Sequence, residues 1–110
     1  AVYCRPFNFY AVDSVRKIHA VQYISHPKFT WKYLRENRNG EFEKGITNAP
    51  QPNDWFVMSI TIKKETIEVF INHLTKPALT INKLSKFYKG KIGLFVGDNS
   101  GGDFRQLTVR

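Results

Sequence analysis

The chain has 110 residues, 42% of them hydrophobic and 15% aromatic, and its formal net charge is +8. A chain of this length is normally one domain, and so apolar a composition excludes a disordered chain. Its 17 Lys and Arg residues are scattered with no run longer than two, whereas nucleic-acid-binding proteins gather charge on one face. We therefore expect no nucleic-acid partner, and no stretch of about 18 apolar residues is present to span a membrane.

The first quarter of the chain predicts two strands. Residues 2–9 (VYCRPFNF) are strand-like, and Pro6 marks an edge, a bulge or the end of that strand because proline cannot donate to a ladder. Residues 13–16 predict a polar turn. Residues 18–25 (IHAVQYIS) alternate as a strand does, and His26-Pro27 ends it.

The next quarter predicts one short helix and one short strand. Residues 29–37 (FTWKYLREN) suit a helical turn with Thr30 as its cap. Asn39-Gly40 predicts a turn, residues 41–46 a short strand, and the proline-containing residues 48–53 a loop.

The second half predicts a hairpin and a terminal strand pair. Residues 55–63 and 66–72 alternate around a Lys-Lys-Glu turn, with Ile67, Val69 and Ile71 inward. A polar connection at residues 73–77, a brief strand at Leu79 and Ile81, and a helical turn at residues 84–88 follow.

At the C-terminus, residues 92–96 alternate and residues 98–102 (DNSGG) require turn conformations. Residues 104–109 resume the apolar signal. The total is seven or eight short strands and no long helix. This predicts an all-β fold, an antiparallel β-sandwich, formed by residues 1–110 as a single domain.

The hairpin WFVMSITI…IEVFIN, the segment GKIGLFVG and the closing SGGDFRQLTV resemble the C-terminal part of concanavalin A-like lectin/glucanase jelly rolls. Within that class, the chain is most similar to laminin-G-like bacterial domains grouped with 3-keto-disaccharide hydrolases. Residues 5–9 (RPFNF), 19–27 (HAVQYISHP) and 31–35 (WKYLR) also resemble a subset of that group. The resemblance implies a jelly roll, carbohydrate-related function, and a periplasmic or secreted bacterial protein. Its motifs are mainly packing and turn residues, so they indicate fold more than function.

Members of this fold are usually longer and begin with strands that close both sheets. This chain starts without Met in a strand-like run, which leads us to expect a processed or truncated product, and an incomplete jelly roll. Either the N-terminal strands are missing, or a second molecule covers what they covered. Because an exposed sheet edge favours pairing between chains, we expect a homo-oligomer.

Catalytic residues are not identified by the sequence. The glycosidases of this fold carry an E-x-D-x-x-E strand, because one acid protonates the leaving group while another attacks or activates water; this chain has none. Glu41 and Glu43 form its only i,i+2 acid pair, on one face of a strand, and solvated charge beside Arg38 and Lys44 is the simpler interpretation. Whether the chain is an enzyme stays open.

Metal and cofactor sites have little support in the sequence. The three His residues, including His73, lie far apart and have no Cys or acid at ligand spacing. The turn with Asp98, Asn99, Ser100 and Asp103 offers too few oxygens for calcium without carbonyls or water. The single cysteine, Cys4, lies in an apolar run, which favours a buried, inert thiol. We expect no metal and no cofactor.

A polar and aromatic set remains as the candidate ligand site, because sugars stack on aromatic rings and bind planar hydrogen-bonding groups. Its members are Arg5, Asn8, His19, Gln22, Tyr23, His26, Trp31 and Arg35. By strand parity His19 and Tyr23 face away from Gln22, so all eight cannot line one surface. Alternatively, Trp31 and Trp55 pack in the core, and Arg5 and Asn8 satisfy backbone groups near Pro6.

Three functions therefore stay open. The first is a saccharide-binding module with its ligand on a concave sheet. The second is a glycoside hydrolase-type enzyme whose catalytic acids lie partly outside this chain. The third is a structural or interaction domain with no small ligand.

Overall fold

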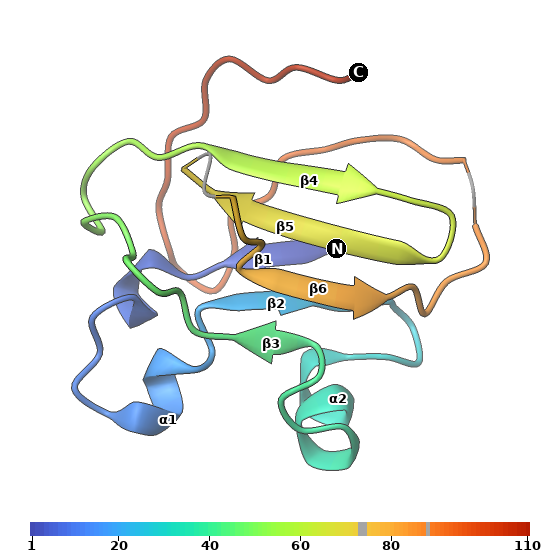
Figure 1. The fold of residues 1–110 in the computed structure, drawn as a ribbon, viewed down its shortest axis with the longest axis horizontal. Coiled ribbons are helices and arrows are strands. Elements are labelled where there is room, and N and C mark those ends of the chain that lie inside the picture. The colour runs from blue at the N-terminus through green and yellow to red at the C-terminus, as the bar shows by residue number, and fades with distance from the viewer. Residues whose placement is uncertain (73–74, 88) are drawn as a thin grey trace.

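The computed structural model describes residues 1–72, 75–87 and 89–110. Its strands form two antiparallel sheets of three strands each (Figure 1). The first sheet has the order β1-β2-β3, with β1 Val2–Cys4, β2 Val21–Tyr23 and β3 Glu43–Lys44. The second has the order β4-β5-β6, with β4 Met58–Ile62, β5 Thr66–Ile71 and β6 Leu79–Asn82. The helices are short: η1 Pro6–Asn8, α1 Ser14–Lys17 and α2 Trp31–Asn37.

The first sheet separates polar and apolar side chains onto its two faces. In the strand register Gln22 lies opposite Tyr3 on β1 and Glu43 on β3, so these three residues share a face. Val21 and Tyr23 point to the other face and are buried in the core. The sheet therefore presents a polar row on the side turned away from the core.

The second sheet contains the predicted hairpin. β4 and β5 pair with Ile60 opposite Val69 and Ile62 opposite Ile67. The expected inward face of β5 is confirmed, since Ile67, Val69 and Ile71 are all buried. β6 pairs with the other edge of β5, which leaves β4 as a free edge.

One hydrophobic core joins both sheets. β2 of the first sheet packs against β6 of the second, and the strands of both sheets run in similar directions (Figure 1). The buried apolar residues are Phe9, Ala20, Val21, Tyr23, Ile24, Leu34, Phe42, Ile46, Ile67, Val69, Ile71, Leu79 and Ile81. The contribution of Leu34 shows that α2 also packs onto this core.

Capping residues mark the starts of α1 and α2, and a proline follows the end of β1. The Thr30 hydroxyl accepts a hydrogen bond from the Tyr33 amide at 3.1 Å, which confirms the predicted helix and its cap. The Asp13 carboxylate caps α1 in the same way, so the expected polar turn is a single helical turn. β1 ends before Pro6, where η1 begins, so Pro6 marks the end of the strand.

The predicted terminal strands do not form. Residues 91–110 have no regular secondary structure, and every one except Gly97 is exposed. A strand needs a partner to satisfy its backbone groups, and the left-handed backbone of Gln106 (φ 55°) interrupts the second segment. The left-handed turn conformation expected within residues 98–102 is found at Asp98 and Asn99, which both have φ of 57°.

The fold class is thus mostly β, and the described residues form six strands in place of the seven or eight expected. Residues 84–87 are not helical, contrary to expectation, and Tyr88 at the end of that predicted turn lies outside the described residues, as do His73 and Leu74. Among the residues described, no helix combines the length and hydrophobicity needed to cross a membrane.

Candidate functional site

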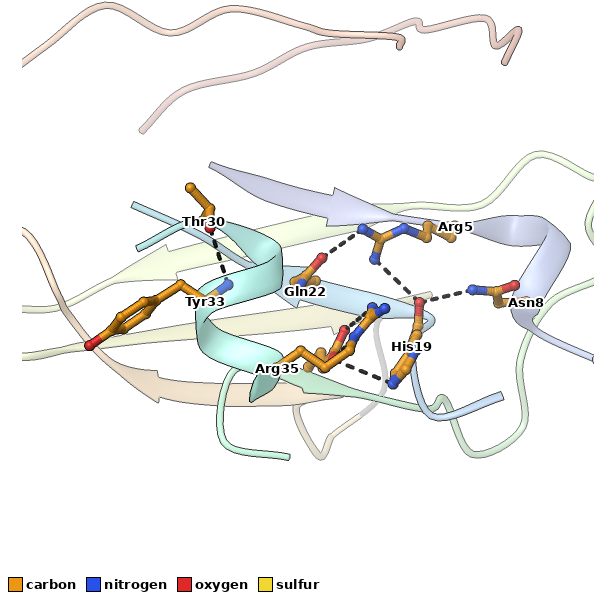
Figure 2. A network of polar contacts seen from close by, with 8 residues as sticks. Arg5, Asn8, His19, Gln22, Thr30, Tyr33 and Arg35 are labelled. Atoms are coloured by element: carbon orange, nitrogen blue, oxygen red, sulfur yellow. Dashed lines mark hydrogen bonds and ion pairs between the residues drawn. The ribbon is translucent and has the colours of Figure 1, made fainter. Parts of the chain in front are cut away.

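A polar cluster lies on the first sheet beneath α2 and beside η1. It consists of Arg5, Asn8, His19, Gln22, Arg35 and Glu43 (Figure 2). Residues on η1, α2, β2 and β3 meet here with Arg5 and His19, which lie in the segments that precede η1 and β2. Five of these six residues were expected at a ligand site from the sequence, and Glu43 was not.

Glu43 occupies the centre of this cluster. It is 4% exposed, and Arg35 on α2 donates to both of its oxygens, at 2.7 and 2.9 Å. The Nε2 atom of His19 lies 3.4 Å from one of the same oxygens. The bidentate pair fixes the planes of the Arg35 guanidinium and the Glu43 carboxylate. Together with His19, it satisfies most of the hydrogen-bonding capacity of this buried carboxylate.

Arg5 and Asn8 hold the other end of the cluster. Arg5 donates to the Gln22 Oε1 atom at 2.6 Å and to the His19 carbonyl at 3.3 Å. The Asn8 side chain donates to that same carbonyl at 3.1 Å. The alternative interpretation was that Arg5 and Asn8 satisfy backbone groups near Pro6. Asn8 does bind a backbone group, the His19 carbonyl, whereas Arg5 binds both that carbonyl and the Gln22 side chain.

The geometry leaves one buried donor without a partner. Arginine carries only donors, so the Gln22 amide must turn its oxygen toward Arg5 and its nitrogen away. That nitrogen, Nε2, is buried and has no hydrogen-bond partner in the described part of the chain. Leaving such a group unpaired costs about 1–3 kcal/mol, so it calls for an explanation.

Gln22 borders a narrow recess between the first sheet and α2. The recess is too small to hold a water molecule, and its lining is Gln22, Leu34, Arg35, Arg38, Gly40, Phe42 and Glu43. Arg38 stands at this recess, where its guanidinium lies 4.6 Å from the centre of the Phe42 ring and pairs with the exposed Glu41 at 2.7 Å. Exposed pairs of this kind are weak, so Arg38 moves at small cost.

Trp31 extends the site to the surface. It is 47% exposed, which excludes the core-packing interpretation, and the Arg35 guanidinium lies 5.1 Å from the centre of its ring. Trp31 and Arg35 lie four residues apart on α2 and therefore on one side of it. An aromatic surface thus adjoins the buried Arg35–Glu43 pair.

Burial and charge act against each other in the cluster. Burial lowers the pKa of His19, although Glu43 opposes this; Arg35 and Arg5 add to the lowering. Burial likewise lowers the pKa of Arg5, and the hydrogen bond to Glu43 raises the pKa of Arg35. The resting site thus holds a neutral imidazole, two guanidinium groups and one carboxylate.

Three of the eight expected residues lie outside the cluster as defined: Trp31, which adjoins it at the surface, Tyr23 and His26. Tyr23 is buried on the core face, 6.1 Å from the Phe42 ring, and His26 is exposed in the loop after β2. The expected parity holds for Tyr23 and Gln22 but fails for His19. His19 precedes β2, which begins only at Val21, so strand alternation does not govern it.

The interpretation of Glu43 as solvated charge is wrong. Only Glu43 lies in a strand; Glu41 lies in the preceding turn, where it is exposed and pairs with Arg38. The two carboxylates therefore do not share a strand face as expected. No pattern around Glu43 marks its burial, because its partners come from α2 and from the segment before β2.

Cys4 and the potential metal ligands of the described residues are the next candidates for a second site. Burial raises the pKa of the half-buried Cys4 thiol to about 12, with Arg5 opposing the shift, so this thiol is a poor nucleophile. Within the described ranges no group of three or more His, Cys, Asp or Glu side chains is placed to hold a metal ion.

In comparisons with known proteins, the chain matches no family model, and neither a curated protein nor a solved structure resembles it to a significant degree. The concanavalin A-like resemblance stays a prediction.

Proposed function

We propose that the chain is a saccharide-binding module of the concanavalin A-like type, whose ligand lies over the polar cluster beside α2. Sugars offer ring hydroxyls to planar amide, guanidinium and carboxylate groups and an apolar ring face to an aromatic side chain. Gln22, Arg35 and Trp31 supply such groups next to one another.

The observation that carries this proposal is the unpaired Gln22 amide. A sequestered N–H group that faces no acceptor is unfavourable in the free protein, and a ligand oxygen that reaches it removes that penalty. The recess is too small for a sugar ring. The ring therefore lies at the surface against Trp31, and one ligand oxygen reaches the Gln22 amide only when Arg38 moves aside and widens the recess.

The experiment is calorimetric titration of the chain with a panel of neutral and acidic oligosaccharides. Trp31→Ala is expected to weaken binding at least tenfold, which corresponds to about 1.4 kcal/mol. Trp55→Ala is the matched control, because Trp55 is equally exposed at 54% and has Arg105 over its ring at 4.1 Å, but lies outside the polar cluster. If no oligosaccharide binds, or if both variants bind equally well, the proposal is wrong and a structural or interaction role is favoured.

The glycoside hydrolase alternative has weaker support. Retaining glycosidases place two carboxyl groups about 5 Å apart on either side of the scissile bond. Here Glu43 is held by Arg35, and Glu41 lies outside the strand and is exposed. Hydrolysis of aryl glycosides or 3-keto sugars that is abolished by Glu41→Gln would favour an enzyme instead.

A further inference from the structure

We infer that the saccharide bound at this site is acidic, and that a ligand carboxylate, as in a uronic acid, binds beside Gln22 in the space that opens when Arg38 moves aside. This inference rests on the proposed function and specifies the chemical class of its ligand. Its basis is an excess of hydrogen-bond donors over acceptors, together with an excess of positive charge.

The acceptors around the recess are already engaged. Both Glu43 oxygens accept from Arg35, the Gln22 oxygen accepts from Arg5, and Glu41 accepts from Arg38. A neutral sugar hydroxyl that donates would have to compete with a guanidinium group for each of these oxygens. The recess therefore favours a ligand group that only accepts.

Donors, in contrast, remain. The Gln22 amide has two N–H groups and no described partner for them. Each guanidinium carries five N–H donors, of which the described hydrogen bonds use two at Arg35 and one at Arg38. A carboxylate, which accepts through both oxygens, matches this set in number and in planar geometry.

Charge favours the same ligand. Arg35 and Arg38 line the recess together with Glu43, Arg5 contacts Gln22 at its border, and Glu41 pairs with Arg38. Three guanidinium groups are therefore balanced by two carboxylates. The whole chain carries a net charge of +8, so an anionic oligosaccharide is also attracted from a distance.

The test compares two ligands that differ only in the carboxyl group. Tetragalacturonate and its carboxyl-reduced, neutral analogue are titrated into the full chain by calorimetry at fixed salt. We expect the acidic form to bind at least tenfold more tightly. Polyglutamate serves as a control for nonspecific attraction to a basic surface, and equal binding of polyglutamate would overturn the inference.

The Gln22→Glu variant tests whether the preference for an acidic ligand arises at Gln22. The substitution keeps the shape of the side chain and the acceptor for Arg5, but it places a negatively charged oxygen where the amide nitrogen lay. We expect at least a tenfold loss of affinity for tetragalacturonate and a smaller change for the neutral analogue. Unchanged affinity for the acidic form would overturn the inference.

Arg38→Gln provides a second variant, should Gln22→Glu not fold. Arg38 is partly exposed and outside the hydrophobic core, so its replacement should leave the fold intact and weaken only the acidic ligand. Equal affinity of the wild-type chain for both oligosaccharides overturns the acidic ligand but leaves saccharide binding standing. Binding of neither overturns both proposals.

Discussion

Glu43 balances the charges of the polar cluster. Its buried carboxylate lies within hydrogen-bonding distance of Arg35 and 3.4 Å from His19. Without it, the Arg35 and Arg5 guanidinium groups, which repel each other, would have no carboxylate in this partly buried cluster to offset their charge. Breaking one partner of a buried ion pair is strongly unfavourable, whereas an exposed pair contributes little.

We therefore expect Glu43→Gln to lower the free energy of unfolding by about 3 kcal/mol. Glu41→Gln is the matched control, because it removes the same charge from an exposed pair with Arg38, and it should change stability by less than about 1 kcal/mol. Urea denaturation of the two variants measures both values. Equal losses of unfolding free energy in the two variants would show that the burial of Glu43 does not contribute to stability.

His19 should make stability depend on pH. Its pKa in the folded chain is lowered from the ordinary value of 6.5, chiefly by burial and against the pull of Glu43. The unfolded chain therefore binds the proton more readily, so the contribution of His19 is complete above pH 6.5 and is lost as the pH falls below it. Asp13 and the guanidinium groups of Arg35 and Arg5 are the other charges that act on it.

The measurement is the difference in unfolding free energy between the wild-type chain and His19→Gln, followed from pH 7.5 to pH 5. Taking the difference cancels the carboxylates that titrate in both proteins. We expect the wild-type advantage to shrink as the pH falls. An advantage that grows instead would mean that attraction to Glu43 outweighs burial.

At the scale of elements, a close backbone contact brings β3 against α1. A Cβ atom on Gly45 would lie 2.9 Å from the carbonyl oxygen of Lys17, which a real side chain does not tolerate. Glycine thus lets the chain after Glu43 approach the turn that carries His19.

Gly45→Ala should therefore destabilise the fold by about 1–3 kcal/mol, as overpacking against a rigid backbone does. Gly93→Ala is the control, because Gly93 has open space around it and should be neutral or slightly stabilised. Thermal denaturation of both variants checks this. A Gly45→Ala chain as stable as the control would contradict the described contact.

The sequence predicts elements whose signals are local. Thr30 and the apolar spacing that follows predict α2, and the alternation around Lys63–Glu65 predicts the β4–β5 hairpin. The burial of Glu43 is not predictable in this way, because it depends on the register of β3 with Gln22 and on Arg35 of another element. Parity fails for His19 because the true start of β2 lies two residues beyond it.

At the scale of the whole molecule, apolar side chains remain exposed on β4. Ile60 and Ile62 are 44% and 67% exposed, although they share a sheet face with the buried Val69 and Ile67. The first sheet meets the second at β2 and β6, so it does not extend over the outer strand. The alternating residues 92–96 are likewise outside any strand, although alternation alone predicted one.

We propose that two chains associate through β4, which is an edge strand of its sheet in the described part of the chain and carries exposed apolar side chains. Light scattering should then give twice the chain mass of 12.8 kDa, and Ile62→Lys should restore the monomer. A compact monomer in solution scattering at high protein concentration would rule this association out.

The central claim is that a saccharide binds over the polar cluster, and nuclear magnetic resonance tests it most directly. Tetragalacturonate is titrated into 15N-labelled chain while the Gln22 side-chain amide and the indole N–H groups of Trp31 and Trp55 are followed. We expect saturable shifts at Gln22 and Trp31, with Trp55 unchanged. No shift at Gln22, or shifts centred on Trp55, would contradict the account.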